Sequence, residues 1–74
     1  MKTEAKNIKV GDIFTENGLT VKVTNITNDD YKNGAENYTI ETVSISYNKK
    51  IYPSMKIGLV CIYRKKAKTI VNIK

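Results

Sequence analysis

The side chains that most often carry out chemistry in proteins are scarce in this chain of 74 residues. It contains no histidine, so the commonest general base and the commonest metal ligand are both missing. The serines at positions 44, 46 and 54 have only lysines and scattered carboxylates to activate them. Since a hydroxyl nucleophile needs an adjacent base, we expect a protein that is not an enzyme.

One cysteine and one acidic stretch are the other candidates for a catalytic or metal site. Cys61 lies in the most apolar segment, where a thiol is usually a small buried hydrophobic group. A single cysteine forms neither an internal disulfide nor a metal-binding cluster. Asp29, Asp30 and Glu36 supply three carboxylates, whereas calcium takes about six to eight oxygens. We therefore expect no metal and no cofactor.

Two short segments combine cations with aromatic rings. The first extends from Tyr47 to Tyr52 and the second from Tyr63 to Lys68. Single-stranded nucleic acids are held by this combination, because cations follow the phosphates while ring faces stack on bases. If both turns lie on one rim of a barrel, the segments converge. The expected nucleic-acid-binding residues are Tyr47, Lys49, Lys50, Tyr52, Arg64, Lys65, Lys66 and Lys68.

A structural role for the same residues stays open. Tyr47 has the same strand phase as Val43 and Ile45, and Tyr63 has the same phase as Cys61. Both rings can therefore belong to the core, with only the hydroxyl exposed. Lysines in the turns then only keep a small domain in solution.

Charge is distributed unevenly along the chain. There are 13 Lys and Arg against 7 Asp and Glu, a net charge of +6. All seven acids lie before residue 42, whereas residues 42–74 carry eight basic residues and no acid. The field of such a one-signed half extends over a Debye length of about 8 Å at physiological salt. It favours a polyanionic partner, either nucleic acid or an acidic host protein.

β-Branched residues and two-residue alternation recur along the chain and predict strands rather than helices. Asn17-Gly18 between apolar runs predicts a type I′ hairpin turn. Changes of phase at Ile26 and near Glu41 and Thr42 indicate bulges. The expected strands are Ile13–Thr15, Thr20–Thr27, Tyr38–Tyr47, Ile57–Tyr63 and Lys68–Ile73, while Ile51–Met55 contains Pro53 and is an edge piece or a 3₁₀ turn.

These elements predict an all-β fold. Five strands with bulges in about 70 residues fit a small five-stranded barrel, SH3-like or OB-like, built from consecutive hairpins. A chain of this length forms a single domain, residues 1–74. A barrel also hides the edges that a short open sheet exposes.

The cellular location follows from what the chain lacks. Ile57–Tyr63, the longest apolar run, is far shorter than the roughly 20 residues of a membrane-spanning helix. The first residues are polar and mixed in charge, unlike a secretion signal. We expect a cytoplasmic protein without a membrane partner. The abundance of Lys, Asn, Ile and Tyr is typical of AT-rich genomes, including those of phages and mobile elements.

Two functions are compatible with these features. The first is a nucleic-acid-binding module that contacts mainly phosphates. The alternative is a small protein-binding adaptor or inhibitor, encoded by a phage or mobile element and acting on a host protein. The segment Ile57–Tyr63 is apolar on both faces, so one face can bind a partner or join two copies in a homo-oligomer.

Overall fold

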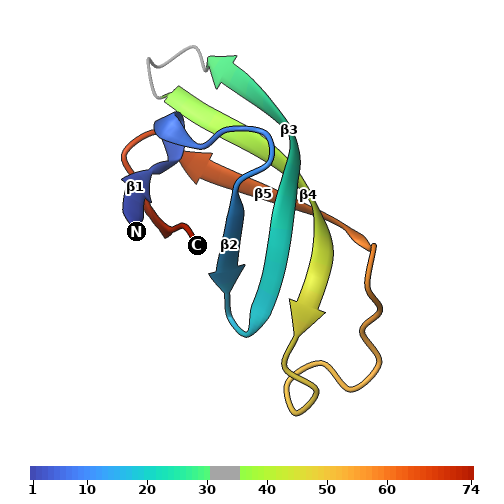
Figure 1. Ribbon diagram of the computed structural model, residues 1–74. Coiled ribbons are helices and arrows are strands. Elements are labelled where there is room, and N and C mark those ends of the chain that lie inside the picture. Colours follow the sequence, from blue (N-terminus) through green and yellow to red (C-terminus); the bar gives the residue numbers. More distant parts are fainter. Residues whose placement is uncertain (31–35) are drawn as a thin grey trace.

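The structure is a computed structural model that describes the backbone of residues 1–30 and 36–74 and the side chains of residues 1–28 and 37–74. The described chain contains six strands, one short 3₁₀ helix and no α-helix (Figure 1). The elements are β1 (Lys2–Glu4), η1 (Ala5–Asn7), β2 (Ile13–Glu16), β3 (Leu19–Asp30), β4 (Glu36–Tyr47), β5 (Val60–Lys66) and β6 (Ile70–Asn72). No helix in the described part of the chain is long and apolar enough to cross a bilayer.

The strands form two antiparallel sheets. The larger has the order β2-β3-β4-β5, and the smaller pairs β1 with β6. An isolated bridge between Phe14 and Ile73, together with a 2.8 Å hydrogen bond from Lys74 N to Ile13 O, joins the chain after β6 to β2. The expected all-β class is confirmed. The expected closed barrel is not, because β2 and β5 are not paired in the described chain.

The first hairpin forms where the sequence predicts it. Asn17 and Gly18 have φ values of 52° and 81°, and a type I′ turn requires positive φ at both central positions. Glu16 pairs with Leu19 directly beyond the turn. The side chain of Phe14 is thereby placed opposite that of Val21, and both are fully buried.

The long β3–β4 ladder contains two irregularities. Val23 pairs with Thr42 and Asn25 with Glu41, so Thr24 is an extra residue on β3. This position agrees with the phase change at Ile26 in the same strand, whereas β4 itself continues without a bulge through Glu41 and Thr42. The second irregularity lies at residue 45 of β4, because the partners of residues 20 and 21 are residues 46 and 44. This second irregularity is not expected from the sequence.

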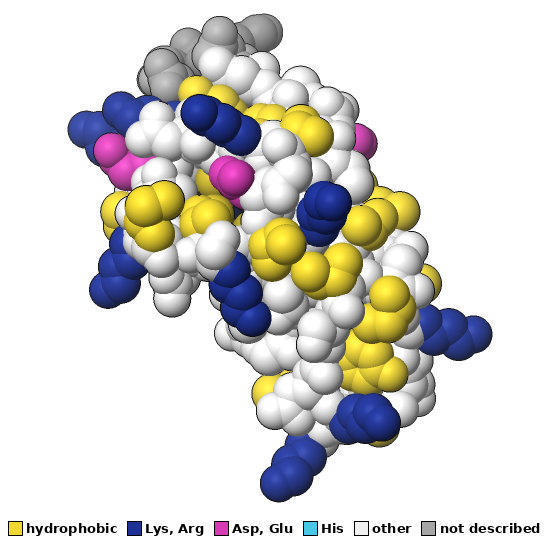
Figure 2. All heavy atoms as spheres, in the orientation of Figure 1, with side chains coloured by type: hydrophobic (Ala, Val, Ile, Leu, Met, Phe, Trp, Pro, Cys, Tyr) yellow, Lys and Arg dark blue, Asp and Glu magenta, His cyan; other side chains and the backbone are white. Residues whose placement is uncertain are grey.

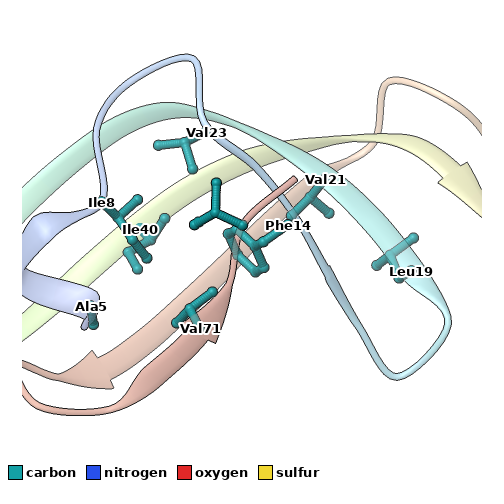
Figure 3. Packing of buried hydrophobic residues seen from close by; sticks show 9 residues of the cluster. Ala5, Ile8, Phe14, Leu19, Val21, Val23, Ile40 and Val71 are labelled. Carbon is teal, nitrogen blue, oxygen red and sulfur yellow. The ribbon is translucent and has the colours of Figure 1, made fainter. Parts of the chain in front are cut away.

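The hydrophobic core lies between the curled larger sheet and the terminal segments β1, η1 and β6. Figure 3 shows the buried side chains converging from both ends of the chain and from β2, β3 and β4. The rings of Phe14 and Tyr63 meet edge to face at 5.3 Å, so β2 and β5 are in contact through side chains although their backbones are not paired. The core residues are Ala5, Ile8, Phe14, Leu19, Val21, Val23, Ile40, Val71 and Ile73.

The strand expected at Ile57–Tyr63 is displaced toward the C-terminus. β5 begins only at Val60, and Arg64 to Lys66, expected as a turn, lie within it. They pair with residues 37–39 because β4 begins at Glu36 and supplies a partner for each. The segment Ile51–Met55 forms turns, one of its two expected conformations.

Candidate interaction surface

The two basic segments lie at opposite ends of the sheet. Lys66 pairs with Asn37 near the start of β4, whereas Lys49 and Lys50 follow its last residue, Tyr47. Ten residues of strand separate these points, about 33 Å at 3.3 Å per residue. The longest dimension of the molecule is 39 Å. The expectation that both turns share one rim is therefore wrong, as the positions of the two ends of β4 in Figure 1 show.

In the first segment the aromatic rings are part of the folded scaffold. Tyr47 and Tyr52 are half-buried and pack against the core. The Tyr52 hydroxyl donates a 2.9 Å hydrogen bond to the carbonyl oxygen of Asn17 in the first hairpin turn. Of the candidate residues in this segment, Lys49 and Lys50 are exposed. The structural role left open for Tyr47 is thus the one observed.

In the second segment, strand alternation divides the candidate residues between two faces. Tyr63 and Lys65 are half-buried on the inner side of β5, while Arg64 and Lys66 are exposed. Lys68 follows the strand and is also exposed. Because successive side chains of a strand point to opposite faces, these cations do not form one continuous surface.

Lys65 is already paired within the protein. Its Nζ lies 2.7 Å from Glu16 Oε1 and 5.7 Å from the centre of the Tyr63 ring, and only 13% of its side chain is exposed. Burial raises the pKa of the Tyr63 hydroxyl to about 12, and electrostatic interactions with Cys61, Glu16 and Tyr52 act in the same direction. Glu16 therefore neutralises one cation of the expected nucleic-acid site.

Acidic residues lie at the same end of the sheet as the exposed cations of β5. Asp29 pairs with Asn37, and Asn37 pairs with Lys66, so the backbones of the Asp29 and Lys66 positions are two strand spacings apart, about 10 Å. Asp30 and Glu36 are the next pair in this ladder. The backbone positions of these acidic residues therefore lie at the same end of the sheet as Arg64 and Lys66. Figure 2 likewise shows cations at separate places from one end of the visible face to the other.

Exposed apolar side chains extend along β5 and the segment before it. Val60 is 70% exposed, Ile62 59%, Ile57 60% and Leu59 44%. Val43, on β4, pairs with Val60 and lies on the same face. We call Val43, Ile57, Leu59, Val60, Ile62 and the adjoining strand edge the β5 surface. Val43, Val60 and Ile62 share the outer face of the β4–β5 ladder, and exposed apolar side chains grouped on a small domain often mark a site of association.

The arrangement of β4 explains why apolar groups point outward. Thr42 and Ser44 are fully buried beneath this surface. Thr42 Oγ1 donates a 2.8 Å hydrogen bond to Cys61 O, and Ser44 Oγ donates one of 2.7 Å to Lys56 O and accepts one of 3.0 Å from Leu59 N. Because these buried hydroxyls are satisfied, they hold the inner positions.

Val43 and Ile45 face outward, although their spacing in the sequence gives them the same strand phase as Tyr47, which packs against the core. Val43 is half-buried and Ile45 is 37% exposed. Serine or threonine at 42, 44 and 46 alternates with β-branched residues at 43 and 45, so either face of this strand can be the inner one. The irregularity at residue 45 changes the phase again, which lets Tyr47 pack inward.

One edge of β5 has no strand partner in the described chain. β4 occupies the other edge along the whole of β5. Beyond the end of β5, Ala67 O accepts a 3.1 Å hydrogen bond from Lys6 N, so the N-terminal segment closes only the ladder past Lys66. An unpaired edge presents backbone donors and acceptors to a further strand. The β5 surface thus combines apolar side chains with free hydrogen-bonding capacity.

The described residues contain no group of three or more cysteine and carboxylate side chains that could hold a metal ion. Cys61 is half-buried, and its thiol lies 3.8 Å from Leu59 O. Comparisons with protein-family models, curated proteins and solved structures find no match. Among the described residues, the fold and surface define the class: a small antiparallel β domain whose edge strand, β5, exposes apolar side chains in its first half and basic ones in its second half.

Proposed function

We propose that this chain is a small, incompletely closed β-barrel that acts by binding another protein through the β5 surface. The observation that supports this most directly is the exposure of Val60 and Ile62 beside the unpaired edge of their own strand. Full burial of one such side chain is worth about 1.5–3 kcal/mol. A partner that covers the β5 surface therefore gains several such contributions in one place.

Protein is the better match to this surface than nucleic acid. Contact with Val60 or Ile62 adds no affinity for a phosphate group, because phosphates are bound by cations. The cations that the sequence brings together are divided between two ends of the molecule, and Lys65 is paired with Glu16. The rings of Tyr47 and Tyr52 are packed against the core rather than presented for base stacking.

The test is affinity capture from the native cell with the tagged full chain, after nuclease treatment. The informative variant is Ile62→Thr, and the matched control is Ile70→Thr, because both isoleucines are 59% exposed and lie in strands. Threonine keeps the β-branch that strands favour. We expect a stoichiometric protein partner that Ile70→Thr retains and Ile62→Thr binds roughly tenfold more weakly, a loss of about 1.4 kcal/mol.

Two outcomes oppose the proposal. Equal binding by both variants would show that the β5 surface is not the contact. Capture that disappears with nuclease, and that depends on Arg64 and Lys66, would establish a nucleic-acid-binding module in its place.

A further inference from the structure

Given the proposed function, we infer that the occupant of the β5 surface is an extended segment of the partner that adds to the sheet as an antiparallel strand. Every second side chain of this segment lies on the same face of the sheet as the exposed residues of β5. In chain order, the first two of these side chains are acidic and the next two are apolar. The acidic pair faces Lys66 and Arg64, and the apolar pair faces Ile62 and Val60.

The pattern follows from the outer face of β5. Val60, Ile62, Arg64 and Lys66 are its exposed, alternating residues, so one half of the face is apolar and the other half is basic. A strand paired with this edge places its own alternate side chains about 5 Å from these four. Apolar residues next to the first two and carboxylates next to the last two are the complementary set.

Charge supports an acidic occupant. Arg64 and Lys66 make no ion pair with any described side chain. Their direct partners on β4 are Thr39 and Asn37, which carry no charge, and Glu41, the partner of Ile62, is a diagonal neighbour of Arg64 on the same face. The free edge is the other side from which a carboxylate can reach Arg64 and Lys66. Opposite charges facing one another across paired strands stabilise the pairing.

The same strand restricts where the occupant lies. Lys65 points inward from β5 to Glu16, and inward-pointing charged residues on edge strands oppose indiscriminate pairing. The hydrogen bond from Lys6 N to Ala67 O occupies the ladder past Lys66. The added strand is thus limited to the length of β5, seven residues.

A second copy of this chain is a poorer occupant. Two β5 strands paired antiparallel about Ile62 would place Arg64 of each copy opposite Val60 of the other, and no carboxylate would face the cations. Each chain also carries a net charge of +6, which opposes self-association.

The probe is a synthetic peptide with the sequence Glu-Thr-Glu-Thr-Ile-Thr-Val, seven residues like β5. Its control has lysine at both glutamate positions. Amide chemical shifts of the full chain report where each peptide binds. We expect shifts along β5 and β4 with the glutamate peptide and about tenfold weaker binding of the lysine peptide. Two further peptides, N-methylated at alternate positions, should differ, because only one set of amides faces β5.

Charge reversal on the protein completes the test. The double variant Arg64→Glu with Lys66→Glu should bind the glutamate peptide about tenfold more weakly than the wild type does, and it should bind the lysine peptide more tightly. The matched control is Lys49→Glu with Lys50→Glu, which makes the same charge change at the other end of the sheet. Its affinity for the glutamate peptide should stay within about twofold of the wild-type affinity.

Three results would overturn the inference. The first is a glutamate peptide that fails to bind, and the second is binding that causes chemical-shift changes only outside β5 and β4. The third is an affinity of this peptide that is the same for the wild type and for Arg64→Glu with Lys66→Glu. If Ile62→Thr nevertheless abolishes capture of the cellular partner, the proposed function stands and only the strand-addition mode fails. If Ile62→Thr leaves that capture unchanged, the proposed function fails.

Discussion

At the scale of single residues, the pair Glu16 and Lys65 shows how the interior uses a charge that sequence analysis assigned to the surface. Lys65 lies between two exposed basic residues of β5, and its sequence neighbours suggest a solvated turn. Strand alternation turns it inward instead, where Glu16 from β2 meets it at 2.7 Å. No local pattern connects two residues 49 positions apart, so this contact could not be predicted.

The ion pair yields a stability prediction. Glu16→Gln leaves Lys65 partly buried without its carboxylate, so the free energy of unfolding should fall by about 1 kcal/mol. The control is Glu4→Gln, whose carboxylate lies 4.0 Å from Lys6 Nζ in a more exposed pair. Its effect should stay within about 0.3 kcal/mol. Urea unfolding measures both, and equal effects would contradict the structural role of the Glu16–Lys65 contact.

Tyr63 yields a prediction about alkaline pH. Its pKa is raised from 10.0 to about 12 in the folded chain, first by burial. The unfolded chain therefore releases this proton earlier, and the associated stability, complete below pH 10, is lost as pH rises through 10 to 12. Unfolding titrations of the wild type and Tyr63→Phe measure it. The variant should lose less stability in that window, and parallel curves would contradict the assignment.

At the scale of elements, the hairpins of the sheet can be predicted from the sequence, whereas the inner face of β4 cannot. Asn17-Gly18 determines its turn locally through positive φ, and the phase change at Ile26 reports the extra residue in β3. The face of β4 depends instead on hydrogen bonds that Thr42 and Ser44 make to residues 56–61. Those partners are distant in sequence, so apolar alternation alone indicated the wrong face.

The hydroxyl of Ser44 should hold the segment before β5 in place. Ser44→Ala removes the hydrogen bonds to Lys56 O and Leu59 N and should destabilise the protein by about 1–3 kcal/mol. The Leu59 amide should then exchange faster with solvent. Ser46→Ala, on the same strand but exposed, is the control and should change neither quantity. Unchanged Leu59 exchange in Ser44→Ala would contradict the tethering role.

At the scale of the whole molecule, the distribution of charge limits what the net value of +6 can do. Residues 42–74 contain no acid, but strand order decides where their cations lie. Because β5 pairs antiparallel with β4, the segments around residues 49 and 66 are directed to opposite ends. Summed charge therefore did not translate into one binding surface.

This separation predicts weak binding of nucleic acid. Single-stranded DNA and RNA oligonucleotides should bind only at low salt, with dissociation constants of about 10⁻⁴ M or weaker at physiological ionic strength. Lys49→Glu with Lys50→Glu and Arg64→Glu with Lys66→Glu should weaken this binding independently. Fluorescence anisotropy over a salt series is the measurement. Micromolar affinity at physiological salt, lost with either pair, would instead favour a joint nucleic-acid site.

Amide hydrogen exchange of β5, measured in the free chain and in the complex with its captured protein partner, tests the central claim most directly. Alternate amides of Val60–Lys66 that face away from β4 should exchange rapidly in the free chain and become protected in the complex. If the exchange rates of the β5 amides are the same in the complex and in the free chain, and protection appears instead around Lys49 and Lys50, the partner binds elsewhere.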